Sequence, residues 1–359
     1  MRARIIFQAH FGKTTSTPIF IVIHFIERRK ISRAFIVTGL LVIVCYCKTV
    51  MAQTADKNLV NIYLADPTIF NHKGIYFLYG TVGGNANNGF IVYTSKDMKL
   101  WKKGTKNRGG FALKKGDAYG RANFWAPQVF MNNNTFYMAY VADENIAIAT
   151  SENPAGPFTQ KNIQPLDAPV KQIDPFVFID NDGKKYLYHV RLTNGNKIFV
   201  AEMEHDLSAI KPGTLKECIT ATEPWENTAN APWPVTEGPS IIKHENVYYL
   251  FYTANDFRNP DYAVGYATSN TPYGPWKKYA GNPIISNKNI GVNGTGHGDF
   301  VMDAQNNLSY VFHTHFSDSV VAPRKTAIVK VMFLKDGRSP IDKLVVDKKS
   351  FHFALTKVD

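Results

Sequence analysis

The chain has 359 residues, of which 45% are hydrophobic and 13% aromatic, so it holds enough apolar side chains for a large core and is not intrinsically disordered. Its formal net charge is +12, but residues 1–52 carry eight basic residues and one acidic residue, which leaves 33 basic and 28 acidic residues, a balance of +5, in the rest of the chain. Because this excess is scattered rather than gathered in a stripe, we expect no nucleic-acid partner.

Residues 1–52 have the features of an export signal. The basic stretch Glu27-Arg28-Arg29-Lys30 precedes an apolar run over residues 34–47, and a site of small residues ends at Ala52. The run is shorter than the roughly 20 residues of a membrane span. We therefore expect cleavage after Ala52, no stable membrane span afterwards, and a secreted or periplasmic protein, with an uncleaved anchor as the alternative. The long stretch before Arg28 also indicates a start codon assigned too far upstream.

A repeated unit runs through residues 53–359. Each copy begins with a polar corner, often ending in proline, followed by a short apolar strand, a polar turn and a strand rich in tyrosine and phenylalanine. The five corners with their first strands are 66–70, 126–130, 174–178, 237–242 and 297–302. A third apolar strand follows in each copy and a fourth, edge-like segment in several. Five such units predict an all-β, five-bladed β-propeller with four antiparallel strands per blade, in one domain. A two-sheet sandwich, the alternative, does not explain five copies.

Three of the five corners carry a carboxylate: Asp66, Asp174 and Glu237. The first strand of a propeller blade lines the central axis, so we expect equivalent corner positions to converge on one cavity. Three like charges there are unfavourable for folding and raise pKa values, which is typical of a functional site. A single Asp-Pro is more often a turn, but glutamate has little turn-forming advantage. The three acids together predict catalysis.

The motifs around these acids resemble those of glycoside hydrolase family 43. The similarity extends from about Leu64 to Val331 and rests on four corners: Leu64-Ala65-Asp66-Pro67, Trp125-Ala126-Pro127, Ile173-Asp174-Pro175 and Thr236-Glu237-Gly238-Pro239. The resemblance implies that Asp66 is the general base, that Glu237 is the general acid, and that Asp174 tunes the pKa of the acid and orients it. It also implies inversion of configuration. Hydrolysis of a glycosidic bond requires two carboxyl groups in different protonation states, which agrees with this set.

Four further residues are candidate substrate contacts. Phe124 and Trp125 would stack on a sugar or fill the core, and Arg324 resembles an arginine that family members place beside the terminal sugar. His297 opens the fifth blade, and the resemblance implies a role near a central structural calcium ion, reached through water, or near the catalytic water. Two tryptophans of a proline-rich loop are candidates for outer subsites: Trp225 and Trp233. The chemistry requires no cofactor.

The predicted activity is hydrolysis of plant-type oligosaccharides or polysaccharide side chains. Because no large second domain follows Val331, we expect an α-L-arabinofuranosidase, with β-xylosidase, galactofuranosidase and endo-arabinanase as alternatives. A retaining β-fructosidase is disfavoured, since Ala65, Ile173 and Gly238 do not match its usual motifs. A non-catalytic carbohydrate-binding propeller would not need three carboxylates in register.

Overall fold

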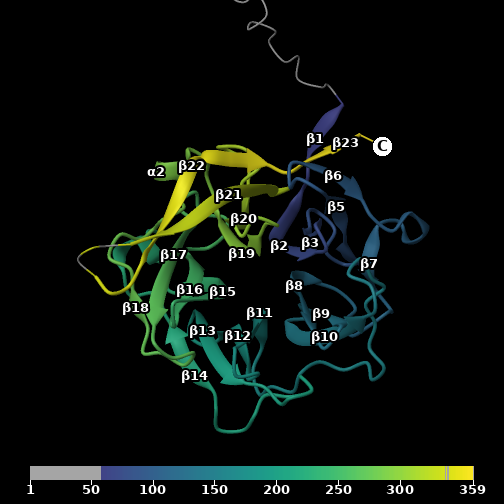
Figure 1. Ribbon diagram of the computed structural model, residues 1–359, viewed down its shortest axis with the longest axis horizontal. Helices are drawn as coiled ribbons and strands as arrows, with labels where there is room; N and C mark the ends of the chain where they lie inside the picture. Colours follow the sequence, from purple (N-terminus) through teal and green to yellow (C-terminus); the bar gives the residue numbers. More distant parts are fainter. Residues whose placement is uncertain (1–57, 336, 338, 359) are drawn as a thin grey trace, which may run out of the picture. The chain divides into compact units, whose positions relative to one another are not determined.

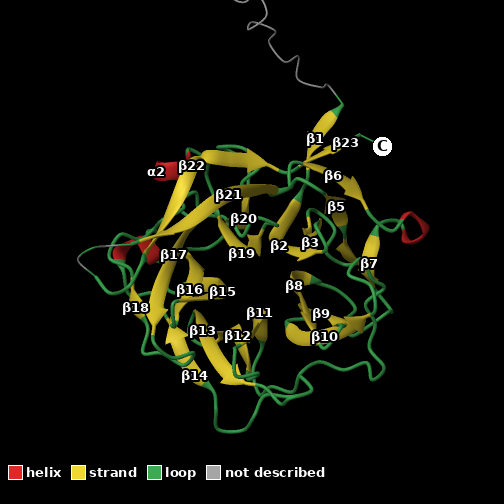
Figure 2. Cartoon of the chain, in the orientation of Figure 1, coloured by secondary structure: helices red, strands yellow, loops and turns green. Residues whose placement is uncertain are grey.

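The computed structural model describes residues 58–358 except 336 and 338, so the predicted signal segment 1–52 lies outside the described residues. Residues Asn58–Asp359 form one compact unit. Strands dominate it, and its only described helices are three short turns, η1 (Lys106–Arg108), η2 (Pro224–Glu226) and α2 (Asn287–Ile290) (Figure 2). None of these described helices is long enough to cross a membrane.

Five sheets surround a central axis, which confirms the predicted propeller (Figure 1). The innermost strands are β2 (Leu64–His72), β8 (Trp125–Asn132), β11 (Gln172–Ile179), β15 (Thr236–His244) and β19 (Gly296–Met302). The second strands are β3 (Ile75–Val82), β9 (Thr135–Ala142), β12 (Lys185–Leu192), β16 (Val247–Ala254) and β20 (Leu308–Thr314). The third strands are β5 (Tyr93–Ser95), β10 (Asn145–Ser151), β13 (Asn196–Glu202), β17 (Ala263–Ser269) and β21 (Lys325–Leu334). The fourth strands are β6 (Leu100–Lys103), β14 (Lys216–Ile219), β18 (Lys277–Lys278) and β22 (Lys343–Phe353).

Two blades depart from four antiparallel strands. The second blade has three strands, and its outer segment is reduced to a bridge between Thr150 and Thr159. The first blade is extended by β23 (Leu355–Lys357), which runs parallel to β6, and by β1 (Leu59–Asn61), which runs antiparallel to β23. A separate pair, β4 (Gly89–Ile91) and β7 (Phe111–Lys114), lies beside it. The ring is therefore closed by segments from both ends of the compact unit.

The core lies between the blades, because both faces of each inner sheet are covered. In β16, Tyr248, Leu250 and Tyr252 pack into the apolar cluster on one side of the blade, whereas Tyr249 and Phe251 pack into the cluster on the other side. Successive side chains of a strand point to opposite faces, so an unbroken aromatic run fills two interfaces at once. This explains why the second strand of each repeat is so rich in tyrosine and phenylalanine.

Candidate active site

Each innermost strand begins with a β-bulge that contains one residue in the left-handed backbone region. These five residues are Asp66 (φ 47°), Ala126 (φ 45°), Asp174 (φ 56°), Gly238 (φ 57°) and His297 (φ 44°). Non-glycine residues seldom adopt this conformation, and such strain concentrates at functional sites. The five bulges therefore define the structurally equivalent corner of each blade.

The predicted register of the three acids is wrong for Glu237. The corner residue of the fourth blade is Gly238, and Glu237 lies one position earlier, where the second blade has Trp125. Asp66, Asp174 and His297 line a small cavity on the propeller axis, of about 20 Å³. Glu237 is not among the described residues that line this cavity, and its side chain contacts Asn196 of the third blade and Tyr262 of the fourth. The acids still converge, because Asp174 Oδ2 accepts a hydrogen bond from the Gly238 N–H at 3.1 Å.

Four polar side chains contact the carboxylate of Asp66. Its Oδ2 accepts a hydrogen bond from the Thr81 hydroxyl at 2.6 Å, and its Oδ1 accepts one from Arg324 Nη1 at 3.2 Å. The imidazoles of His297 and His313 lie 3.5 and 3.3 Å from Oδ1. Burial alone would raise the pKa of Asp66, but the charge of Arg324 and the contacts with the two histidines outweigh it and hold this pKa well below the ordinary 3.8. Asp66 is therefore ionised at neutral pH.

His313 is fully buried and stays neutral. The Asp66 N–H lies 3.1 Å from its Nδ1, and Arg324 Nη1 lies 3.1 Å from its Nε2. A protonated imidazole has no acceptor for either donor, whereas the neutral ring accepts one of them. Burial and the charge of Arg324 lower the pKa of His313 to about 3. The ring thus positions Asp66 and Arg324 without carrying charge.

Glu237 has a different environment. Tyr262 donates its hydroxyl hydrogen bond to Oε1 at 2.7 Å, and Asn196 Nδ2 donates to Oε2 at 3.1 Å. Burial and the nearby charge of Asp174 raise the pKa of Glu237 to about 7. Burial and the charge of Asp66 likewise raise the pKa of Asp174 to about 7. Because the two groups interact, they titrate as a pair, and this pair holds a proton near neutral pH.

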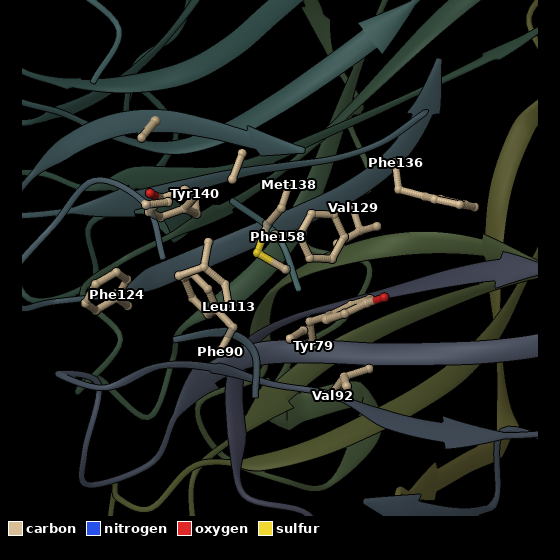
Figure 3. Packing of buried hydrophobic residues seen from close by; sticks show 14 of the residues in the cluster. Tyr79, Phe90, Val92, Leu113, Phe124, Val129, Phe136, Met138, Tyr140 and Phe158 are labelled. Carbon is tan, nitrogen blue, oxygen red and sulfur yellow. The ribbon is translucent and has the colours of Figure 1, made fainter. Parts of the chain in front are cut away.

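The substrate contacts expected from the sequence fall into different places. Arg324 reaches Asp66 and also lies over the ring of Phe257, with 4.6 Å from Cζ to the ring centroid. His297 lines the axial cavity, and Trp125 is half-buried at the position equivalent to Glu237. The prediction that Phe124 contacts sugar is corrected by its burial, because Phe124 is 0% exposed and packs against Phe90 and Tyr140 (Figure 3).

Sequence reasoning missed three polar partners of the acids: His313, Tyr262 and Asn196. His313 is the last but one residue of β20 and lies opposite the residue before the corner, where the other blades carry Thr81, Val141, Val190 and Thr253. At three of these positions the side chain accepts the N–H of the next blade's corner residue: Thr81 that of Ala126, Thr253 that of His297, and His313 that of Asp66. Comparing this one position across the repeats would have revealed His313.

The chain is similar to known proteins over most of its length. The model of the family described as Glycosyl hydrolases family 43 matches residues 56–339. Among solved structures, an endo-1,4-β-xylanase from Bacteroides thetaiotaomicron is 39% identical with a TM-score of 0.75, covering 83% of this chain and 98% of that one. A thermostable family-43 glycoside hydrolase is 35% identical with a TM-score of 0.71, covering 82% and 95%.

Two curated relatives are more distant. The β-D-galactofuranosidase xynD of Aspergillus niger is 24% identical, covering 77% of this chain and 81% of its own length. A xylosidase/arabinosidase of Butyrivibrio fibrisolvens is 30% identical over 51% of this chain, but this match spans only 36% of the relative. The family match covers most of the chain, including all three acids. The chain belongs to glycoside hydrolase family 43.

Proposed function

We propose that this chain hydrolyses glycosidic bonds of plant hemicellulose or arabinan with inversion of configuration, using Asp66 as base and Glu237 as acid. The observation that carries the proposal is the separation of two carboxyl pKa values in one site. The pKa of Asp66 is held well below its ordinary value by Arg324, whereas burial and Asp174 raise that of Glu237 to about 7. Such a divided pair is what acid and base roles at neutral pH require.

The proposed reaction is a single displacement. Ionised Asp66 takes a proton from a water molecule as its oxygen bonds to the anomeric carbon, and Glu237 gives its proton to the departing glycosidic oxygen as that bond breaks. Asp174 contributes through its charge, because it helps to keep Glu237 protonated. Solvent exchange then returns the proton from Asp66 and restores the one on Glu237.

We propose an α-L-arabinofuranosidase as the first candidate activity. Its support is the set of relatives, which includes an extracellular exo-α-(1→5)-L-arabinofuranosidase of Streptomyces avermitilis, 22% identical over 76% of this chain. Hydrolysis of β-1,4-xylosyl bonds is the second candidate, and the 39% identity to a protein named an endo-1,4-β-xylanase favours it. Galactofuranosidase and endo-arabinanase stay as further alternatives.

The test is a panel of nitrophenyl furanosides and pyranosides, followed by arabinan, arabinoxylan and xylan. Proton NMR of the first product then reports the configuration at the anomeric carbon. Turnover with inversion on any of these substrates supports the proposal. No turnover by the folded chain on the whole panel, or retention of configuration, would contradict it.

A structural calcium ion is a further proposal for the axial cavity. Its volume of about 20 Å³ holds roughly one water molecule or ion, and Asp66, Asp174 and Asp299 are among the residues that line it. Calcium prefers oxygen ligands, so His297 would act through bound water, and the ion's charge would offset the repulsion among the acids. Chelator treatment followed by thermal melting tests this, with a calcium-reversible loss of stability as the expected result.

We also propose that the chain acts outside the cytoplasm, secreted or in the periplasm. The support is the sequence of residues 1–52, with its basic stretch, apolar run and small residues before Gln53. N-terminal sequencing of the exported protein should give Gln53 as the first residue. A protein that keeps its apolar run and sediments with membranes would instead be anchored.

A further inference from the structure

We propose that Trp233 forms the platform for the sugar on the leaving-group side of the scissile bond, and that it orients the acid Glu237 through Asn196. This inference rests on the proposed hydrolase function and adds a positioning chain to it. Trp233 and Asn196 are tied by a hydrogen bond of 2.9 Å, and Asn196 and Glu237 by one of 3.1 Å.

Trp233 is exposed, whereas the other described tryptophans are buried or half-buried. It lies in the segment between β14 and β15, four residues before Glu237, and is 46% exposed. Trp101 is 1% exposed, and Trp225 of the same loop packs on Tyr252 with 5.7 Å between ring centroids. An exposed indole that is fixed by its own N–H offers a rigid π face, and the C–H groups of a sugar ring carry the complementary partial positive charge.

Asn196 is fixed to the strand that carries the acid. Its N–H donates to the Pro234 carbonyl at 2.9 Å, and its carbonyl accepts from the Thr236 hydroxyl at 3.0 Å. Gly195 permits this approach, because it has φ +120° and a Cβ there would lie 2.7 Å from the Pro234 oxygen. The backbone of Asn196 is therefore fixed relative to the strand that carries Glu237.

Trp233 determines which way the Asn196 amide faces. The indole N–H is only a donor, so the amide oxygen Oδ1 must face it, and Nδ2 is then directed at Oε2 of Glu237. With Tyr262 on Oε1, the carboxyl group is held on both oxygens. Without the indole N–H only the contact with Glu237 orients the amide, so the amide holds the carboxyl group less firmly.

The position of Trp233 assigns it to the leaving-group side. In an inverting site the acid contacts the departing oxygen and the base activates water on the opposite face of the sugar ring. Asn196 and Trp233 are connected to Glu237, whereas Arg324 and His313 contact Asp66. The occupant of Trp233 is therefore the next sugar unit of the polymer, bound by an apolar ring face.

Three variants separate the two roles of Trp233. Trp233→Phe keeps an aromatic face and removes the N–H, Trp233→Ala removes both, and Asn196→Leu removes the amide alone. Met332→Ala is the matched control. Met332 is 43% exposed and lies near the end of β21, whereas Arg324 directly precedes the start of this strand. Each variant is compared on the best oligosaccharide of the panel, on the methyl glycoside and on the dinitrophenyl glycoside of the same sugar, with thermal melting to verify folding.

The expected pattern is a split between kcat and KM. Trp233→Phe and Asn196→Leu should lower kcat about tenfold on the oligosaccharide and methyl glycoside, corresponding to one lost hydrogen bond, and change the dinitrophenyl reaction less than twofold. Trp233→Ala should add a rise of about tenfold in KM on the oligosaccharide alone. Wild-type kcat and KM in folded Trp233→Ala would overturn the inference, and equal losses on all three substrates would overturn the orienting role.

Binding measurements distinguish failure of the platform from failure of the proposed function. Calorimetry with xylotriose and arabinotriose compares Asp66→Asn with the double variant Asp66→Asn/Trp233→Ala, without any turnover. An affinity about tenfold weaker in the double variant is expected. Equal affinities would contradict the platform even if the wild type is active, whereas an inactive wild type with a Trp233-dependent affinity would contradict only the hydrolase function.

Discussion

Asp66 and Glu237 are carboxyl groups of the same site in opposite electrostatic environments. Asp66 lies at a strained blade corner, beside Arg324 and the imidazoles of His297 and His313. Glu237 lies one residue before its own corner, and its hydrogen-bond donors are the neutral groups of Tyr262 and Asn196. Both are largely removed from water, so burial raises both pKa values. Only Asp66 has a guanidinium group to reverse the effect.

The comparison shows that the partners, and not the carboxyl group or its burial, separate the two pKa values, which is the basis of the proposed base and acid roles. Asp174 accentuates the difference, because its charge raises the pKa of Glu237. Removing Arg324 should therefore raise the pKa of Asp66, whereas removing the charge of Asp174 should lower the pKa of Glu237. The two limbs of the pH–rate profile should move in opposite directions.

The largest effect is expected from Asp66→Asn. Removing the group that activates water should lower kcat at least 10²- to 10⁴-fold on every substrate, while sugar binding persists. Steady-state kinetics and calorimetry with an oligosaccharide check the two parts. Activity above a few per cent of the wild type would mean that another residue is the base.

Glu237→Ala should have an effect that depends on the leaving group. A sugar alcohol needs a proton to depart, so activity on oligosaccharides should fall about 10²- to 10⁴-fold. A dinitrophenolate departs as an anion, so the loss on a dinitrophenyl glycoside should be far smaller. The same loss on both kinds of substrate would exclude Glu237 as the acid.

Arg324→Met should move the acid limb of the pH–rate profile. As the proposed base, Asp66 must be ionised, so activity should be lost as pH falls through its pKa, and removing the guanidinium raises that pKa. The acid limb should shift upward by about one unit or more, with kcat near neutral pH lowered about tenfold through the lost contact. The control is Arg121→Ala, because the Arg121 side chain is 92% exposed. An unchanged acid limb would contradict the role of Arg324.

Asp174→Asn should give the smallest of these effects, which is a change in stability whose direction depends on pH. The pKa of Asp174 is raised from 3.8 to about 7, so the folded state loses stability as pH rises from about 4 to 7. The asparagine keeps an acceptor for the Gly238 N–H but carries no charge. In calcium-free buffer with a chelator, its Tm should exceed the wild-type Tm by a few degrees at pH 8 and by less at pH 4, while activity falls. A lower Tm at pH 8 would contradict the repulsion.

The repeat in the sequence predicted most of the fold, because each blade has its own corner, turn and aromatic strand. The register of Glu237 was not predictable from the same comparison of the repeats. Thr236-Glu237-Gly238-Pro239 contains one residue more than the Asp-Pro corners, and only the backbone shows that Gly238 takes the corner. A Cβ on Gly238 would also lie 2.8 Å from the His297 ring, so contact with the next blade further restricts this position.

Other parts of the site depend on contacts between segments far apart in sequence. Phe124 and Trp125 are adjacent aromatic residues, yet only Phe124 is in the core, because it lies just before β8 and packs against Phe90 and Tyr140, whereas Trp125 begins the strand and is half-buried. Tyr262 directly precedes β17 and Asn196 begins β13, and they reach Glu237 over 25 and 41 residues. Such partners carry no local pattern.

The closure of the ring has a consequence for synthesis of the chain. β23 follows all five blades in the sequence, yet it pairs with β6 of the first blade and with β1. While the ribosome is still translating residues 343–357, the outer edge of the first blade has no partner strand, and unpaired edges invite association with other chains. Nascent chains of this propeller should therefore be protected by chaperones until late in translation, and assembly of the candidate active site should be completed only after translation.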